Sequence, residues 1–100
     1  MKIVFTVRGS RRALIVDTWW RENRLDNPEL FQSELEYAKR RLLENPHVGR
    51  PYKKIRGKLF RQLLLRRCQQ WVFYRVLEDE ELVVIHSVWG TQRGKEPQLD

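Results

Sequence analysis

Three short apolar segments in the second half of the chain constrain its fold most strongly. They are LFRQLLLR (residues 59–66), WVFYRVL (71–77) and LVVIHSVW (82–89), and each has the length and apolar content typical of a β-strand. Only four residues separate one segment from the next. A parallel connection needs about a dozen residues, so we expect the three strands to pair as an antiparallel meander.

The N-terminal segment KIVFTV (residues 2–7) predicts a further strand, because β-branched and aromatic residues dominate it and Arg8-Gly9 follows. Ser10 is then a suitable N-cap for a helix. Over residues 11–23 the apolar side chains gather on one side of a helical wheel. We therefore expect a strand that is followed directly by an amphipathic helix.

A second helix is indicated between Asn27 and Asn45. Asn27-Pro28 supplies an N-cap and a Pro at the first helical position, and Asn45-Pro46 ends the helix. Only a few residues separate the two helices, so we expect an antiparallel helical hairpin. The buried stripe of the second helix is expected to comprise Phe31, Leu35, Ala38 and Leu42.

The predicted elements follow one another in the order β-α-α-β-β-β. This order is typical of an α+β fold, in which an antiparallel sheet carries the helical hairpin packed on one face. Residues 49–57 are rich in Gly, Pro, Lys and Arg, and we expect a loop or an irregular edge there. A length of 100 residues with 41% apolar content suits a single domain over residues 1–100.

Positive charge is concentrated in the middle third of the sequence. Residues 45–77 carry nine Lys or Arg and no Asp or Glu, whereas residues 1–44 carry nine bases and seven acids. Residues 78–100 carry two bases and six acids, and the whole chain has a net charge of +7. Charge placed in this way favours a polyanion or an acidic protein as partner, and a solvated basic surface without a dedicated ligand is the alternative.

Few residues are suited to a disulfide or to metal binding. Cys68 is the single cysteine, and its spacing from His47 and His86 does not resemble a zinc site. We expect Cys68 to be buried, and we expect no metal and no cofactor. No apolar run approaches the roughly 18 residues of a membrane span, and the N-terminal run is too short for a signal peptide, so we expect a cytoplasmic protein without membrane contact.

Four parts of the chain are informative when taken together. They are WWRENR (19–24), NPELFQSELEYAKRRLLENPHVGRP (27–51), RQLLLRR with VFYRV (61–67 and 72–76) and VWGTQRGKEPQL (88–99). In this order the segments resemble the RelE/ParE superfamily of toxins from bacterial type II toxin-antitoxin systems, also called plasmid stabilisation proteins. The resemblance extends over almost the whole chain.

The resemblance implies a small antiparallel sheet with a helical hairpin on one face, in agreement with the elements predicted above. It also implies a cognate antitoxin, whose acidic C-terminal segment wraps the toxin. Members of the superfamily inhibit growth either by binding DNA gyrase or by cleaving mRNA on the ribosome. Both activities remain open at this stage, as does a degenerate toxin that only binds its antitoxin.

Cleavage of RNA requires a proton acceptor, cations that stabilise charge on the phosphorus, and a proton donor. Arg61, Arg67 and Arg75 lie on or beside adjacent predicted strands, and we expect them to converge on one sheet face. Arg93 matches the family's terminal Arg. In a nuclease the candidate catalytic residues are therefore Arg61, Arg75 and Arg93, and a structural or antitoxin-binding role is the alternative for Arg75.

A larger group of cations is expected to bind nucleic acid or an acidic partner. Trp71 and Phe73 share a strand face with Arg75, and we expect them to be apolar residues that face the antitoxin. Core packing and the stacking of an RNA base are the alternatives. The expected binding residues are Arg50, Lys53, Lys54, Arg56, Lys58, Arg61, Arg67, Arg75 and Arg93.

Two departures from the family weaken the nuclease hypothesis. Many relatives place a His where this chain has Gly90, and the ending KEPQLD lacks the aromatic residue or His that active nucleases often carry. His86 lies within an apolar strand and is expected to be packed and hydrogen-bonded. We expect a ParE-like toxin that binds a target such as DNA gyrase. A RelE-like, ribosome-dependent mRNA endoribonuclease is the alternative, so whether the chain is an enzyme remains open.

Overall fold

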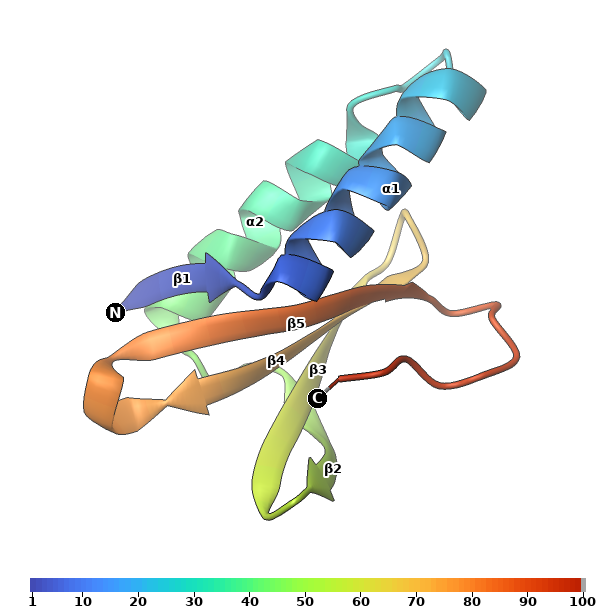
Figure 1. The fold of residues 1–100 in the computed structure, drawn as a ribbon. Coiled ribbons are helices and arrows are strands. Elements are labelled where there is room, and N and C mark those ends of the chain that lie inside the picture. Colours follow the sequence, from blue (N-terminus) through green and yellow to red (C-terminus); the bar gives the residue numbers. More distant parts are fainter. Residues whose placement is uncertain (100) are drawn as a thin grey trace.

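The structure is a computed structural model, and it describes residues 1–99. The chain forms five strands, two α-helices and one short 3₁₀ helix (Figure 1). In chain order these are β1 (Lys2–Phe5), α1 (Val7–Asn23), α2 (Leu30–Glu44), β2 (Arg50–Ile55), β3 (Lys58–Leu65), β4 (Gln70–Leu77), η1 (Glu78–Glu80) and β5 (Leu82–Gly90).

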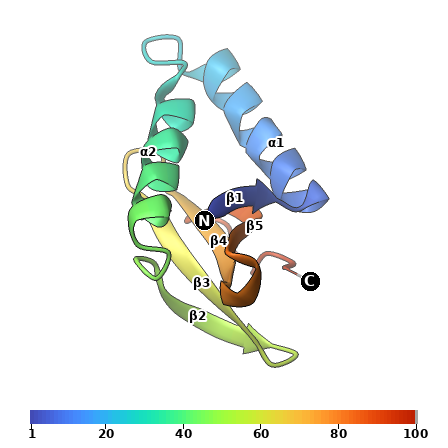
Figure 2. The ribbon, with the colours of Figure 1, turned by 90° about the vertical axis from the view of Figure 1, so that its left-hand side faces the viewer.

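The five strands form one sheet in the order β1-β5-β4-β3-β2. Strands β2 to β5 are antiparallel, which confirms the predicted meander, and both helices cover one face of the sheet (Figure 2). The α+β class and the helical hairpin are therefore confirmed. Strand β1 pairs in parallel with β5, so the sheet is mixed rather than wholly antiparallel. The long connection from β1 to β5 makes a parallel pairing possible.

The second difference concerns residues 50–55, for which we expected a loop or irregular edge and which form strand β2. This strand lies at the edge of the sheet, and its pairing with β3 is irregular between Pro51 and Lys53. Edge strands tolerate Pro and Lys because their outer backbone groups face solvent. Long-range pairing with β3 therefore overrides the local composition.

Helix α1 begins at Val7, earlier than expected, because Thr6 rather than Ser10 is its N-cap. The Thr6 hydroxyl accepts a hydrogen bond from the backbone N–H of Gly9 at 2.9 Å. Gly9 also allows the helix to approach β5 closely, since a Cβ at this position would lie 2.5 Å from the carbonyl oxygen of Ile85. The start of α1 is thus fixed by its cap and by its contact with the sheet.

The main hydrophobic core lies between the helices and the sheet, on what we call the helix-side face. All four residues of the stripe predicted for α2 are buried in it. Tyr74 from β4 is fully buried, accepts a hydrogen bond from the Gly49 N–H and donates one to the Pro46 carbonyl, both at 2.8 Å. These bonds attach the loop after α2 to the centre of the sheet. Cys68 is also buried in this core, as expected.

A second, smaller cluster lies on the opposite side of the sheet, which we call the outer face. It is formed by Phe60, Phe73 and Leu99. Leu99 belongs to the C-terminal segment (residues 91–99), which turns back after β5 and runs toward the outer face (Figure 1). The outer face therefore has an irregular peptide cover in place of a helix.

Candidate functional site

The predicted cations of the middle third lie mostly on the hairpin formed by β2 and β3, which we call the basic hairpin. Lys54 and Lys58 are exposed there. The tight turn between the strands is formed by Arg56 and Gly57, both with positive φ angles, of 54° and 77°. Such a two-residue turn matches the twist of the strands that it joins. The hairpin thus presents several positive charges on an element that projects from the rest of the sheet.

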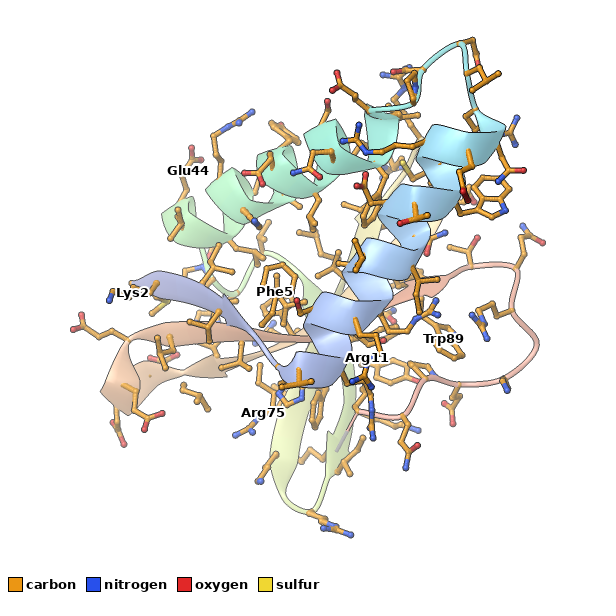
Figure 3. All side chains as sticks on the ribbon, turned by 45° about the horizontal axis from the view of Figure 1, so that its top comes forward. Lys2, Phe5, Arg11, Glu44, Arg75 and Trp89 are labelled. Carbon is orange, nitrogen blue, oxygen red and sulfur yellow. The ribbon has the colours of Figure 1, made fainter. Side chains whose placement is uncertain are left out.

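Arg61 and Arg75 do not converge, and this prediction was wrong. Arg61 is the register partner of Tyr74, which lies in the helix-side core. Its guanidinium donates to the Gly49 carbonyl at 2.8 Å and to the His47 carbonyl at 3.4 Å. Arg75 lies on the outer face instead, with its guanidinium 5.8 Å from the centre of the Phe60 ring (Figure 3).

The other two arginines of the predicted clusters also lie apart. Arg67 belongs to the turn between β3 and β4. Arg93 follows β5 and lies 3.8 Å from the ring centre of Trp89, which pairs with Trp71. Because Arg75 is four residues beyond Trp71 along β4, about 13 Å of strand separates it from the position of Arg93. Successive residues of a strand point to opposite faces, and each residue advances about 3.3 Å along the strand, so arginines on adjacent strands need not lie close together.

The two predicted apolar residues differ in exposure. Trp71 is partly exposed, and the guanidinium of Arg50 lies 5.5 Å from the centre of its ring. Phe73 is only 2% exposed, because it packs with Leu99 in the outer cluster and against Tyr52 at a ring separation of 4.7 Å. A partner can therefore reach Trp71 directly, whereas access to Phe73 requires displacement of the C-terminal segment.

The C-terminal segment is attached to the outer face by polar contacts as well as by Leu99. Glu96 accepts hydrogen bonds from the Tyr52 hydroxyl at 2.8 Å and from the Lys53 ammonium group at 3.0 Å. The indole N–H of Trp89 donates to the Lys95 carbonyl, and Arg8 donates to the Gln98 carbonyl. An acidic side chain of the protein itself therefore occupies part of the basic hairpin.

The groups that could transfer protons are engaged in intramolecular contacts. The Nδ1 atom of His86 donates to the Leu99 carbonyl at 2.8 Å, as expected for a packed histidine, and His47 Nε2 lies 2.7 Å from a carboxylate oxygen of Glu78. Burial and the neighbouring Glu96 carboxylate raise the pKa of Tyr52 to about 12. The His86 imidazole and the Arg75 guanidinium both lie against the Phe60 ring, at 4.9 and 5.8 Å from its centre, whereas Arg93 lies over Trp89.

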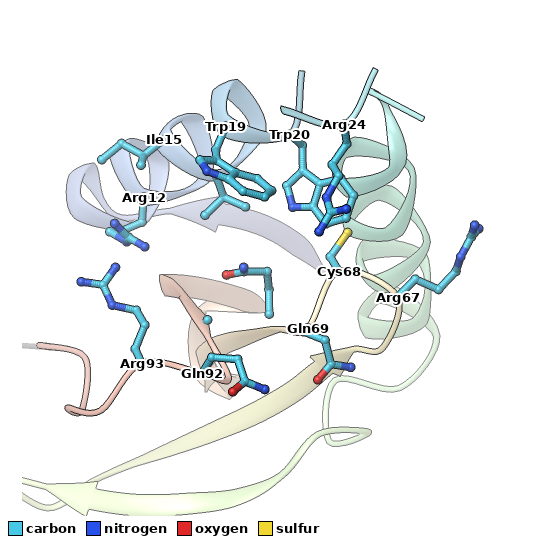
Figure 4. A pocket seen from close by; sticks show the side chains of 13 residues that line it. Arg12, Ile15, Trp19, Trp20, Arg24, Arg67, Cys68, Gln69, Gln92 and Arg93 are labelled. Carbon is cyan, nitrogen blue, oxygen red and sulfur yellow. The ribbon is translucent and has the colours of Figure 1, made fainter. Parts of the chain in front are cut away.

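A second cationic site lies where α1, the turn between β3 and β4, and the residues after β5 meet. It is a cavity of about 450 Å³, which we call the arginine pocket (Figure 4). No Asp or Glu is found among the described residues that line this cavity. The lining residues are Arg12, Ile15, Val16, Trp19, Trp20, Arg24, Arg67, Cys68, Gln69, Gln70, Gly90, Gln92 and Arg93.

Three of its arginines are held by aromatic rings. Arg12 and Arg93 lie 4.9 and 3.8 Å from the centre of the same ring, that of Trp89, and Figure 4 shows their guanidinium groups facing one another. Arg24 lies 5.7 and 5.5 Å from the ring centres of Trp19 and Trp20. Arg67 points away from the cavity.

Arg12 is further fixed by the free edge of β5. Strand β1 pairs with β5 only as far as Ile85, and beyond this point α1 lies along the strand. The Nε atom of Arg12 donates to the Val88 carbonyl at 3.1 Å. Burial and the positive charge of Arg93 lower the pKa of Arg12, so the two cations repel each other in this position.

The comparison with known proteins identifies the family. A family model described as "ParE toxin of type II toxin-antitoxin system, parDE" matches residues 3–94. The chain belongs to the ParE toxin family. No curated protein matches the sequence. The predicted resemblance to the RelE/ParE superfamily is therefore confirmed, and membership of a type II toxin-antitoxin family implies a cognate antitoxin as partner.

Two further observations concern the described residues of this ParE family member. Within residues 1–99, no helix is both long and apolar enough to span a membrane. In the same range, no three His, Cys, Asp or Glu side chains lie close enough together to hold a metal ion.

Sequence reasoning did not select Arg12 or Arg24, although both line the arginine pocket of this ParE toxin. The sequence contains a signal for Arg12, because Arg12, Val16 and Trp20 are spaced by four residues and so share the buried face of a helix. A cation on an apolar stripe is unusual, and its position indicates a site. The sequence also contains a signal for Arg24, because it follows the pair Trp19-Trp20, whose rings its guanidinium group contacts.

Proposed function

We propose that the protein is a growth-inhibiting toxin that acts by binding DNA gyrase, without chemistry on the toxin itself, and that its cognate antitoxin neutralises it. The observation that carries the proposal is the separation of the cations that a nuclease would use. Arg61 is bonded to the loop at Gly49, Arg75 lies over Phe60, and Arg93 lies over Trp89. Family membership together with this separation favours binding over RNA cleavage.

The basic hairpin and the adjoining outer face are the proposed docking surface for the antitoxin. The positive charges there complement an acidic segment, and the partly exposed Trp71 offers an apolar contact. The contacts made by Glu96 support this assignment, because they show that a carboxylate fits between Tyr52 and Lys53. The proposed contact residues are Arg50, Lys53, Lys54, Arg56, Lys58, Arg75, Trp71 and, after displacement of the C-terminal segment, Phe73.

Tightly controlled expression of the chain in bacteria tests the proposed activity. Growth, DNA breaks and transcript integrity are followed in the same cultures, with and without the antitoxin encoded beside the toxin. We expect growth arrest with DNA breaks and intact transcripts, and recovery when the antitoxin is present. Early cuts in transcripts before any DNA damage would instead show a nuclease, and absence of arrest would show a protein that only binds its antitoxin.

A pair of charge reversals tests the docking surface. Lys54→Glu changes an exposed residue of the basic hairpin, and Lys2→Glu changes an exposed residue of β1 at the other edge of the sheet. Both alter the net charge equally, so a general electrostatic effect would be the same for both. We expect the antitoxin to bind Lys54→Glu more weakly than Lys2→Glu in a direct binding assay. Equal affinities would contradict the assignment.

A further inference from the structure

We propose that the arginine pocket binds a nucleoside phosphate, with the phosphate between Arg12 and Arg93 and the base against Trp19. The ligand is a single nucleotide, either free or at the end of a single strand. This inference concerns a site separate from the basic hairpin and does not depend on the toxin's cellular target.

The first step concerns the two arginines that share Trp89. Their guanidinium groups lie 4.9 and 3.8 Å from the same ring centre, and none of the described lining residues supplies a carboxylate to separate them. Burial and, as the smaller cause, the positive charge of Arg93 lower the pKa of Arg12. A phosphate between them would relieve this repulsion and accept hydrogen bonds from both planar groups.

The second step concerns the apolar wall. Trp19 is 48% exposed and Ile15 is 49% exposed, although both lie on the side of α1 that lines the cavity. Inorganic phosphate alone would leave this apolar surface in water. A nucleobase has a flat face that stacks on an indole ring, and such stacking is sequence-tolerant. The combination of arginines and an exposed indole therefore favours a phosphate attached to a flat ring.

The third step concerns the amide side chains of the pocket. The Oε1 atom of Gln70 is buried and has no hydrogen-bond partner among the described residues. The residue Gln70 lines the cavity together with Gln69 and Gln92. A buried acceptor without a partner is unfavourable, and the exocyclic amino group of a base is a suitable donor.

The size and shape of the cavity limit the ligand. A volume of about 450 Å³ lies within the range of small-molecule sites. The inward-facing cations surround one cavity and do not follow a line along the surface. This arrangement suits one nucleotide better than an extended acidic peptide, whose charges would need partners along its length.

The test is a titration of the purified full chain, made by cell-free synthesis so that toxicity does not limit its production. Nucleoside monophosphates are added while the fluorescence of the four tryptophans and the heat of binding are recorded. Inorganic phosphate, unphosphorylated nucleosides and an acidic peptide are added in parallel. A short single-stranded oligonucleotide with a 5′-phosphate distinguishes a strand end from a free nucleotide as the preferred source.

Three variants locate the site. Arg93→Gln removes one of the paired cations and Trp19→Leu removes the stacking surface, so each is expected to weaken binding about tenfold. Arg11→Gln is the matched control, since Arg11 lies on the same helix but is exposed and does not line the cavity. Thermal unfolding of each variant confirms that it is folded.

The expected result is binding of nucleotides that both pocket variants weaken and Arg11→Gln leaves unchanged. Equal binding of inorganic phosphate and nucleotide would overturn the proposal, because the base would then contribute nothing. It would also be overturned by binding of the acidic peptide alone, or by absence of nucleotide binding at about 1 mM, a concentration that detects even weak sites.

Discussion

The two faces of the sheet are covered in different ways. On the helix-side face, α1 and α2 bury a cluster of fifteen of the described residues. On the outer face, the corresponding cluster has only three buried members, and an irregular segment covers it. The cations of the basic hairpin and Arg75 adjoin this second cluster. The difference indicates that one face supplies most of the stability, while the other keeps charged groups within reach of a partner.

The largest expected effect is the loss of a large side chain from the helix-side core. Leu42 is fully buried there, and Leu42→Ala leaves a cavity that the rigid helix and sheet cannot fill. We expect the free energy of unfolding to fall by about 3 kcal/mol. Denaturant unfolding measures this change, and a loss below about 1 kcal/mol would remove the distinction between the faces.

Tyr74→Phe tests the polar attachment of the loop after α2 to the same core. The substitution keeps the ring but removes the hydroxyl that bonds Gly49 and Pro46. The Gly49 N–H then lacks its buried acceptor, so we expect a loss of about 2 kcal/mol. Thermal unfolding provides the measurement, and unchanged stability would show that water replaces the hydroxyl.

Leu99→Ala is the outer-face counterpart of Leu42→Ala. Leu99 is 4% exposed, but the segment that carries it can shift and fill part of the space left. We expect a loss of about 1 to 2 kcal/mol, smaller than at Leu42. The same denaturant experiment applies. An effect as large as that of Leu42→Ala would show that both faces contribute equally to stability.

The smallest expected effect on stability is the pH dependence of the contacts made by Glu96. Lys53 and Tyr52 lower the pKa of this exposed carboxylate below its ordinary value. The contribution of these contacts to the free energy of unfolding is therefore present at a pH above the ordinary Glu pKa, and it is lost as the pH falls through the lowered pKa.

The same contacts can be tested through Tyr52. In Glu96→Gln we expect the pKa of Tyr52 to fall from about 12 but to stay above 10, because burial is the larger cause. Ultraviolet titration of tyrosinate measures this, and an unchanged pKa would contradict the contact.

Much of the fold could be predicted from the sequence because local patterns determine it. The apolar segments of β3 to β5 and the stripe of α2 were recognisable from their periodicity. Strand β2 was missed, since RPYKKI is unfavourable for a strand except at an edge. The parallel pairing of β1 with β5 depends on contacts between residues about 80 positions apart, which local patterns do not contain.

The candidate site was less predictable than the fold. The local excess of Lys and Arg indicated the basic hairpin, because its cations are close together in the sequence. The arginine pocket draws on Arg12, Arg24 and Arg93, which only the packing of α1 beside the free edge of β5 brings together. The predicted convergence of Arg61 with Arg75 failed because the register of β3 and β4 pairs Arg61 with Tyr74, and successive residues of a strand point to opposite faces, so Arg75 lies on the other face.

The most direct test of the proposed function uses purified DNA gyrase and relaxed plasmid. The full chain is added at increasing concentration, and supercoiling and DNA cleavage are measured with and without the cognate antitoxin. If the protein acts by binding gyrase, supercoiling is inhibited, cleaved DNA accumulates, and the antitoxin reverses both effects. Unchanged gyrase activity, together with cleavage of mRNA on purified ribosomes by the same preparation, would contradict the proposal.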